Sequence, residues 1–263
     1  MQHRIDQVSL QYAEHGAGVP LLALHGVGVD HREIEAALEA VVPDRGYRRI
    51  YPDLPGMGHT TAEGLAGNDD VVDLLGAFID RVAAGPVLLL GHSYGAYLAR
   101  AVTARRPDAV LGLALVCPLA EHTGTVPDRT VVRTEPGAYD ELQPEQREGF
   151  DEYFVVRTRA TARRYREHVV PGMALADRTA LERIFARWPV DLSGADYPGP
   201  VLVVAGRRDS TVGYADAAAL LEVYPRATLA VIDDAGHALM HEVPEVLAVL
   251  LANWLDRARA SGG

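Results

Sequence analysis

The sequence is poor in the features that mark secreted, membrane-spanning and nucleic-acid-binding proteins. Cys117 is the only cysteine, which excludes an intrachain disulfide and fits a reducing compartment. No apolar run has the length of a transmembrane helix, and the first residues lack an apolar core of signal-peptide length. Basic residues form no block and the formal net charge is −11, which argues against nucleic acid or an anionic membrane as partners. We therefore expect a cytoplasmic protein.

Apolar residues, by contrast, are abundant enough for a large core. Of the 263 residues, 48% are hydrophobic, and there is no internal repeat or low-complexity segment. Such a chain suits one large domain or two small ones. The composition does not fix the oligomeric state, and a homodimer stays open.

Short apolar runs alternate with longer helical patterns. A segment with period two at 8–16 predicts an antiparallel edge strand, and continuous apolar runs predict buried strands. We expect strands at 8–16, 20–26, 48–56, 86–93, 109–118, 200–210 and 227–237. Helices are expected at 30–41, 68–83, 94–107, 214–225 and 244–259. This alternation indicates a mostly parallel sheet with helices on both faces.

The alternation stops after Pro118 and returns near Pro200. The segment between is charged, rich in Arg and Glu, and too long for an ordinary loop. Its pattern predicts helices at 144–170 and 177–189. We interpret it as a helical insertion at one edge of the sheet.

The stretch Gly91-His92-Ser93-Tyr94-Gly95 joins an expected strand directly to an expected helix. It fits G-x-S-x-G, and a strand–helix junction is the context which that motif requires. Glycines make so tight a turn sterically feasible, and the serine takes a strained backbone conformation that presents its hydroxyl above the sheet. The following helix directs its N-terminus at the same place, which favours developing negative charge. Ser93 is therefore the predicted nucleophile.

A serine hydroxyl needs a base, and the base needs a carboxylate to orient it. His237 follows the last expected strand, and Asp209 follows the strand before it. The chain order Ser93, Asp209, His237 is the order that this nucleophile turn predicts. Asp233 and Asp234 are rival carboxylates, but they precede the histidine by only three or four residues. We rank them as polar residues at a strand end.

The oxyanion of a tetrahedral intermediate needs two hydrogen-bond donors. One predicted donor is the backbone amide of Tyr94, directly after the nucleophile. The other is the amide of Val27, because Gly26 and Gly28 on either side let the backbone turn inward.

These stretches together resemble the α/β-hydrolase superfamily. The residues LHGVG, DLPGMGHT, GHSYGAY, GRRD and DAGH occur in the order of that family and span nearly the whole chain. The resemblance implies a mostly parallel, eight-stranded sheet flanked by helices, with a helical cap inserted after the sixth strand. It divides the chain into an α/β-hydrolase core, residues 1–118 and 197–263, and a cap, residues 119–196.

The resemblance assigns the same roles as the motifs do. Ser93 maps to the nucleophile, Asp209 to the acid and His237 to the base, while Val27 and Tyr94 map to the oxyanion amides. The nucleophile position holds serine, whereas haloalkane dehalogenases and epoxide hydrolases carry aspartate there, which argues against those activities.

Candidates for the substrate pocket come from two regions. Gly26 and His92 adjoin the predicted oxyanion loop and nucleophile, and Tyr153, Phe154 and Trp188 lie in the insertion. Aromatic residues there either cover an apolar substrate or form the core of the cap, and His92 is equally consistent with a packed structural histidine. The other histidines lack the spacing of metal ligands, so neither a metal nor a cofactor is expected.

The motifs favour a serine hydrolase that cleaves an ester, lactone or thioester of a small molecule through an acyl-enzyme. Carbon–carbon bond hydrolysis, amide or iminopeptidase chemistry and perhydrolysis on the same triad stay open. A lyase or cofactor-free oxygenase with His237 as base is a second class, and a non-catalytic binding protein is a third.

Overall fold

A mixed sheet forms the centre of the computed structural model, which describes residues 1–43, 45–119, 126–192 and 197–261. Its strand order is β1-β2-β4-β3-β5-β6-β9-β10. The strands are β1 (Gln2–Ile5), β2 (Val8–Gly16), β3 (Gly18–Leu24), β4 (Gly46–Pro52), β5 (Val87–His92), β6 (Val110–Val116), β9 (Val201–Gly206) and β10 (Ala227–Ile232). β2 pairs antiparallel with β1 and β4, and the other neighbours are parallel. The predicted fold class, a mostly parallel eight-stranded sheet, is confirmed.

The prediction of an edge strand at 8–16 is wrong in one respect. β2 is antiparallel as expected, but the short strand β1 lies outside it and forms the edge. β1 has only four residues and an exposed, polar sequence, so no apolar pattern marks it.

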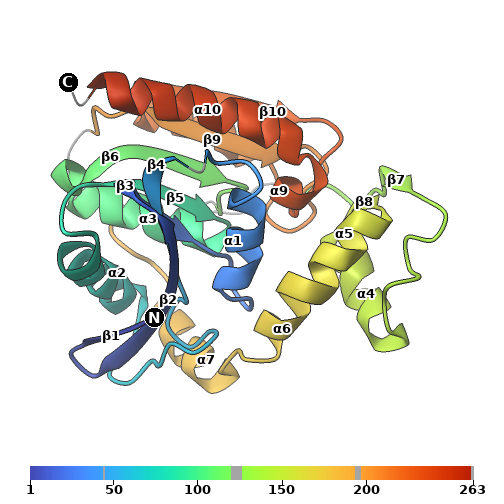
Figure 1. Ribbon diagram of the computed structural model, residues 1–263, viewed down its shortest axis with the longest axis horizontal. Helices are drawn as coiled ribbons and strands as arrows, with labels where there is room; N and C mark the ends of the chain where they lie inside the picture. Colours follow the sequence, from blue (N-terminus) through green and yellow to red (C-terminus); the bar gives the residue numbers. More distant parts are fainter. Residues whose placement is uncertain (44, 120–125, 193–196, 262–263) are drawn as a thin grey trace.

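Helices cover both faces of the sheet (Figure 1). α1 (His31–Leu38) and α10 (Pro244–Ser261) enclose one apolar core with β-strand side chains. α2 (Asn68–Phe78) and α3 (Tyr94–Arg105) enclose the other. Shorter elements are η1 (Ile79–Ala83), η2 (Pro107–Ala109), η4 (Ala215–Ala219), α8 (Leu220–Val223) and α9 (Leu239–Glu242). The helix expected at 214–225 is thus a 3₁₀ turn followed by one short α-helical turn.

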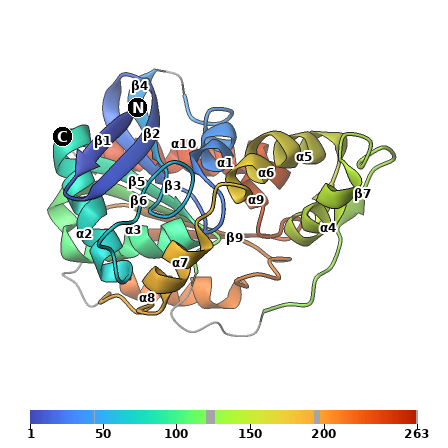
Figure 2. The same ribbon diagram turned by 90° about the horizontal axis from the view of Figure 1, so that it is seen from below.

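The insertion between β6 and β9 is largely helical, and α4, α5 and α6 gather at one end of the sheet (Figures 1 and 2). Its elements are β7 (Arg133–Thr134), α4 (Pro144–Tyr153), β8 (Val156–Arg157), α5 (Arg159–Arg164), η3 (Tyr165–Val169), α6 (Val170–Met173) and α7 (Arg178–Phe185). Residues 120–125 and 193–196, near both predicted junctions of the cap, lie outside the described residues. The boundaries of the cap at 119–196 therefore stay a prediction.

The single helix expected at 144–170 is broken in the structure. α4 ends at Tyr153, and the β-branched pair Val155-Val156 leads into β8, which pairs with β7. Thr158 then caps α5 by accepting a hydrogen bond from the Thr161 amide at 3.1 Å. β-Branched residues favour extended backbone and threonine favours an N-cap, so local preference overrides the surrounding helical pattern.

The junction between β5 and α3 depends on two glycines. A Cβ on Gly91 would lie 2.3 Å from the Gly95 carbonyl oxygen, and a Cβ on Gly95 would lie 2.2 Å from the Leu24 carbonyl oxygen. Backbone atoms on three elements therefore crowd this turn, which has no room for a methyl group.

We expect Gly95→Ala to lower the free energy of unfolding by about 3 kcal/mol or more, because the new methyl group meets backbone that cannot move aside. Glycine-to-alanine changes inside helices ordinarily stabilise by about 1 kcal/mol, so the expected sign is the opposite of the usual one. Urea denaturation measures the effect. Gly85→Ala is the control, since a Cβ there meets nothing within 4 Å; equal stability of the two variants would refute the packing argument.

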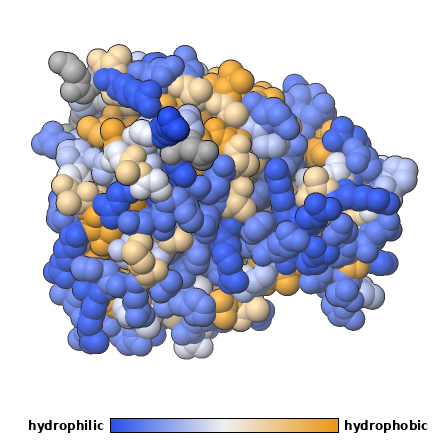
Figure 3. Space-filling model, viewed as in Figure 1, coloured by the Kyte–Doolittle hydropathy of each residue, from blue (hydrophilic) through white to orange (hydrophobic). Residues whose placement is uncertain are grey.

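The surface seen in Figure 3 is mainly hydrophilic, with apolar residues in small groups. Exposed large apolar side chains include Val246 and Val249 on α10 and Leu221 and Val223 on α8, and exposed apolar residues of this kind are normal on protein surfaces. No described helix combines the length and the apolar character needed to cross a membrane.

Candidate active site

Ser93 stands at the sharp junction between β5 and α3. Its backbone has φ 54° and ψ −117°, the left-handed region that disfavours a residue with a side chain. The Ser93 amide donates to the Val116 carbonyl at 3.0 Å, which holds the turn against β6. The strained conformation that the sequence predicts is present, and Ser93 is buried to 6% exposure.

His237 and Asp209 approach Ser93 from the loops after β10 and β9. The Ser93 hydroxyl lies 3.0 Å from His237 Nε2, and His237 Nδ1 lies 2.8 Å from Asp209 Oδ2. The other Asp209 oxygen accepts hydrogen bonds from the amides of Thr211 at 2.9 Å and Val212 at 3.0 Å. The structure thus brings together three side chains that are far apart in the sequence.

The rival carboxylates lie elsewhere. Asp233 is exposed and faces the guanidinium groups of Arg207 and Arg208 at 3.6 and 3.5 Å. Asp234 is also exposed. Asp209, fully buried, is the carboxylate that contacts the histidine ring.

Opposing effects set the charge of the buried pair. Burial alone would lower the pKa of His237, but the charge of Asp209 and its hydrogen bond outweigh burial and raise that pKa above 6.5. Burial alone would raise the pKa of Asp209, but the charge of His237, its hydrogen bond and the two loop amides lower that pKa. The pair therefore favours an ionised aspartate beside a histidine that takes up a proton readily.

The predicted oxyanion residues flank Ser93. A Cβ on Gly26 would lie 3.5 Å from Ser93 Cβ, so the loop after β3 passes directly over the nucleophile. The Gly28 amide, with φ +78°, donates to the Met57 sulfur at 3.1 Å, and the Val27 side chain is 47% exposed. Val27 belongs to this loop and Tyr94 directly follows Ser93, and the role of their amides as donors is a proposal below.

The Tyr94 side chain points into the protein. Its hydroxyl donates to Asn68 Oδ1 at 2.6 Å, and its ring packs against Phe185 and Trp188 with centroids 5.3 and 5.7 Å away. This ring therefore ties α3 to α2 and to the segment after α7.

Three of the predicted pocket residues contact the triad. Gly26 lies beside Ser93, while His92 and Tyr153 lie beside His237. His92 Nε2 donates to the His237 carbonyl at 3.0 Å, and burial lowers the pKa of His92 to about 4, so the ring is neutral. The Tyr153 ring meets the His237 ring edge-on at 6.4 Å. Tyr153 also lines a cleft of about 330 Å³ beside Val27 and Thr211.

The other two predicted pocket residues pack elsewhere among the described residues. Phe154 is fully buried against Phe150, Tyr165 and His241, inside the insertion. Trp188 stacks on Tyr97 at 5.3 Å. Neither lines the cleft described above, because Phe154 packs in the apolar cluster of the insertion and Trp188 packs on Tyr94 and Tyr97 of α3.

Two buried glutamates near the triad are not among the residues predicted from the sequence. Glu242 accepts hydrogen bonds from the amides of Gly236 at 2.6 Å, Val155 at 2.7 Å and Val156 at 3.1 Å, so its carboxylate joins the insertion to the histidine loop. Glu33 on α1 accepts a hydrogen bond from the Tyr153 hydroxyl at 2.6 Å. Both look like ordinary solvated helix acids in the sequence, and only the fold buries them.

Two groups of described residues have donor atoms within 4.8 Å of one another, the distance that metal ligands need. They are His92, Cys117 and His237, and Asp30, His31 and Asp53. In each group a histidine already bonds a carboxylate: His237 bonds Asp209, and His31 Nδ1 lies 2.6 Å from Asp53 Oδ1. Sequence spacing could not reveal either group, because the first joins three separate segments and the second joins the start of α1 to Asp53 after β4.

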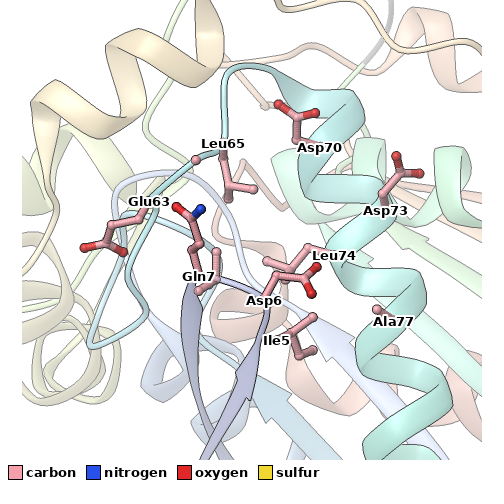
Figure 4. Close-up of a pocket in the computed structure, with 11 residues that line it drawn as sticks. Ile5, Asp6, Gln7, Glu63, Leu65, Asp70, Asp73, Leu74 and Ala77 are labelled. Carbon is pink, nitrogen blue, oxygen red and sulfur yellow. The ribbon is translucent and has the colours of Figure 1, made fainter.

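A second cavity, of about 320 Å³, lies between the β1–β2 hairpin and α2. Figure 4 shows Asp6 and Gln7 from the hairpin and Asp70 and Asp73 from α2 around it. None of the predicted site residues lines this cavity.

The order of the sheet and the Ser93 turn at the end of a buried parallel strand define the α/β-hydrolase class of proteins. A model described as the alpha/beta hydrolase family matches residues 21–250, and the chain belongs to this family of hydrolases.

Two relatives that the chain matches over nearly its whole length are named as hydrolases. The chain is 26% identical over 253 residues to (E)-2-((N-methylformamido)methylene)succinate hydrolase of Acinetobacter baylyi, with 93% of each chain covered. It is 26% identical over 265 residues to 2-hydroxymuconate semialdehyde hydrolase of a Pseudomonas species, covering 94% of this chain and 90% of the relative. A crystal structure of an alpha/beta superfamily hydrolase from Oenococcus oeni aligns with a TM-score of 0.86 and 26% identity, covering 98% and 99% of the two chains.

Proposed function

We propose that the protein is a serine hydrolase that cleaves an ester-type bond of a small molecule through an acyl-enzyme. One observation carries this proposal: the continuous hydrogen-bonded chain from Ser93 Oγ through both ring nitrogens of His237 to Asp209. A hydroxyl, a base and an orienting carboxylate in this arrangement are the requirements for activating a serine.

In the proposed mechanism Ser93 Oγ attacks the substrate carbonyl while His237 Nε2 takes its proton. Asp209 keeps Nδ1 protonated and stabilises the positive ring. The amides of Val27 and Tyr94 donate to the oxyanion of the tetrahedral intermediate. His237 then gives the proton to the leaving alcohol, and the same nitrogen activates water to release the acid.

We further propose that the cap, residues 119–196, covers the bound substrate. The cleft beside Val27 supports this, since Tyr153, Tyr165 and Met173 of the insertion form part of its wall. No cofactor enters the mechanism, because each proton transfer has a residue to carry it.

Hydrolysis of a carbon–carbon bond on the same triad is the second candidate. The likeness to 2-hydroxymuconate semialdehyde hydrolase over 94% of the chain favours it. A turnover screen of acyl esters, lactones, thioesters and vinylogous diketones, with Ser93→Ala as blank, separates the two. Turnover of esters supports the proposal, and turnover of diketones alone would replace it.

The pH profile gives an independent check on the base. His237 must be neutral to accept the proton, and its raised pKa places the acidic limb of kcat/KM above pH 6.5. Activity is expected to be lost as the pH falls through that limb and to be complete above it. Initial rates from about pH 5 to 9 at fixed ionic strength measure the acidic limb of kcat/KM. A midpoint of that limb well below pH 6.5 would contradict the coupling of His237 to Asp209.

A further inference from the structure

Glu33 is a buried charge that the proposed mechanism does not use. It sits in the first turn of α1 with 0% exposure, and its Oε1 contacts the Tyr153 hydroxyl at 2.6 Å and His241 Nε2 at 3.4 Å. Its other oxygen, Oε2, has no hydrogen-bond partner among the described residues. Burying a carboxylate is costly, so an ionised one next to a catalytic site calls for an explanation.

The carboxylate keeps its negative charge despite burial. Burial alone would raise the pKa of Glu33, but contact with His241 and the hydrogen bond from Tyr153 lower that pKa. Among the described histidines, His241 is the one that contacts the carboxylate, at 3.4 Å; burial lowers the pKa of His92 and His25, so those two rings supply no balancing charge.

Glu33 lies one hydrogen bond behind the wall of the cleft that Val27, Tyr153 and Thr211 line. Tyr153 forms part of that wall, its ring packs on His237, and its hydroxyl donates to Glu33. Val29, four residues before Glu33, also lines the cleft. A charged group of a substrate in this cleft would therefore lie within a few ångströms of Tyr153, whose hydroxyl contacts the Glu33 carboxylate.

The cleft offers little to balance that charge. Most of its described lining is apolar or aromatic: Val27, Val29, Tyr153, Tyr165, Val169 and Met173. Arg129 and Glu152 are its charged lining residues; both are exposed, and their charges oppose each other. The carboxylate of Glu33, whose Oε2 has no hydrogen-bond partner among the described residues, thus places negative charge behind the Tyr153 side of the cleft.

We propose that this site takes substrates whose acyl group is uncharged and largely apolar, and that the buried carboxylate of Glu33 excludes acyl groups that end in a carboxylate. The inference rests on the proposed acyl-enzyme function and names its substrate class. Like charges a few ångströms apart in a poorly solvated site repel strongly, whereas a neutral acyl group loses nothing.

Matched esters test the substrate class in the wild-type protein. p-Nitrophenyl esters of methyl glutarate and of glutarate share a leaving group and an acyl chain but differ by one charge. We expect kcat/KM for the neutral ester to exceed that for the anionic ester by about tenfold or more at pH 8. Equal values would overturn the proposal.

Glu33→Gln tests the residue itself. It keeps the shape and an acceptor for Tyr153 but removes the charge, and it is expected to reduce the preference for the neutral ester by about tenfold. Glu35→Gln is the control, since Glu35 lies on the same helix and faces His15 at 2.6 Å and His31 at 3.7 Å instead of Tyr153. An unchanged preference in a folded Glu33→Gln variant would exclude Glu33 as the source.

Three further outcomes have a defined meaning. If Glu33→Gln does not fold, as judged by near-UV circular dichroism, the wild-type comparison still decides whether the substrate class is right. If Ser93 reacts with a fluorophosphonate but the neutral ester has no advantage, the inference fails and the proposed function stands. If Ser93 does not react and neither ester is cleaved, the proposed function fails as well.

Discussion

Ser93→Ala is expected to abolish hydrolysis while the fold remains. Removing the hydroxyl leaves the substrate without a nucleophile, and kcat should fall by about 10⁵-fold or more. Alanine occupies the same volume less one oxygen, and the tight turn depends on Gly91 and Gly95 rather than on the serine side chain. Initial rates on the best substrate of the screen measure the loss, and a thermal melt checks the fold.

Ser210→Ala is a suitable control for this experiment. Ser210 lies in the loop beside Asp209, in the same region of the fold, and has no part in the proposed proton transfers. It should retain wild-type rates. Substantial turnover by Ser93→Ala would instead favour the lyase or oxygenase class, in which His237 acts as the base without a covalent intermediate.

Asp209→Asn is expected to lower kcat by about 10⁴-fold, by analogy with other triads. An amide in place of the carboxylate presents an N–H group to His237 Nδ1 or fails to stabilise the positive ring, so the histidine takes the wrong tautomer. The loop should survive, since the amide oxygen can still accept hydrogen bonds from Thr211 and Val212.

The matched control is Asp233→Asn, which alters the exposed rival carboxylate next to Arg207 and Arg208. This variant should keep wild-type activity. If Asp209→Asn were nearly as active as the wild type and Asp233→Asn were not, Asp233 after β10 would be the triad acid instead of Asp209 after β9.

The sequence predicted the layout of the site because each triad residue follows an apolar strand. Ser93 and Asp209 follow runs whose continuous hydrophobicity marks buried parallel strands, and His237 follows the half-buried edge strand β10. The carboxyl ends of parallel strands lie at one edge of a sheet. The fold then brings the His237 ring within hydrogen-bond distance of both Ser93 and Asp209.

Residues that act from the side of the site could not be predicted in the same way. Glu33 and Glu242 sit at helix positions where an acid is normally solvated, and their burial depends on how the insertion docks on α1 and α9. The same docking determines that Tyr153 meets the His237 ring while Phe154, its neighbour, packs into the interior. Adjacent aromatic residues carry no sequence signal that tells these two environments apart.

Local preferences explain the errors in the helical insertion. The expected helix at 144–170 has a helical pattern on both sides of a short extended segment, and periodicity averages over the break at Val155-Val156. The break ties the insertion to the histidine loop, because the amides of both valines donate to Glu242, which also accepts a hydrogen bond from the Gly236 amide.

Mass spectrometry of the protein after reaction with a fluorophosphonate tests directly whether Ser93 is an activated nucleophile. We expect one adduct per chain, located by peptide mapping at Ser93 and lost in both Ser93→Ala and heat-denatured protein. Labelling of a different residue, or no adduct on native protein under conditions that label a control serine hydrolase, would contradict the assignment of Ser93 as an activated nucleophile.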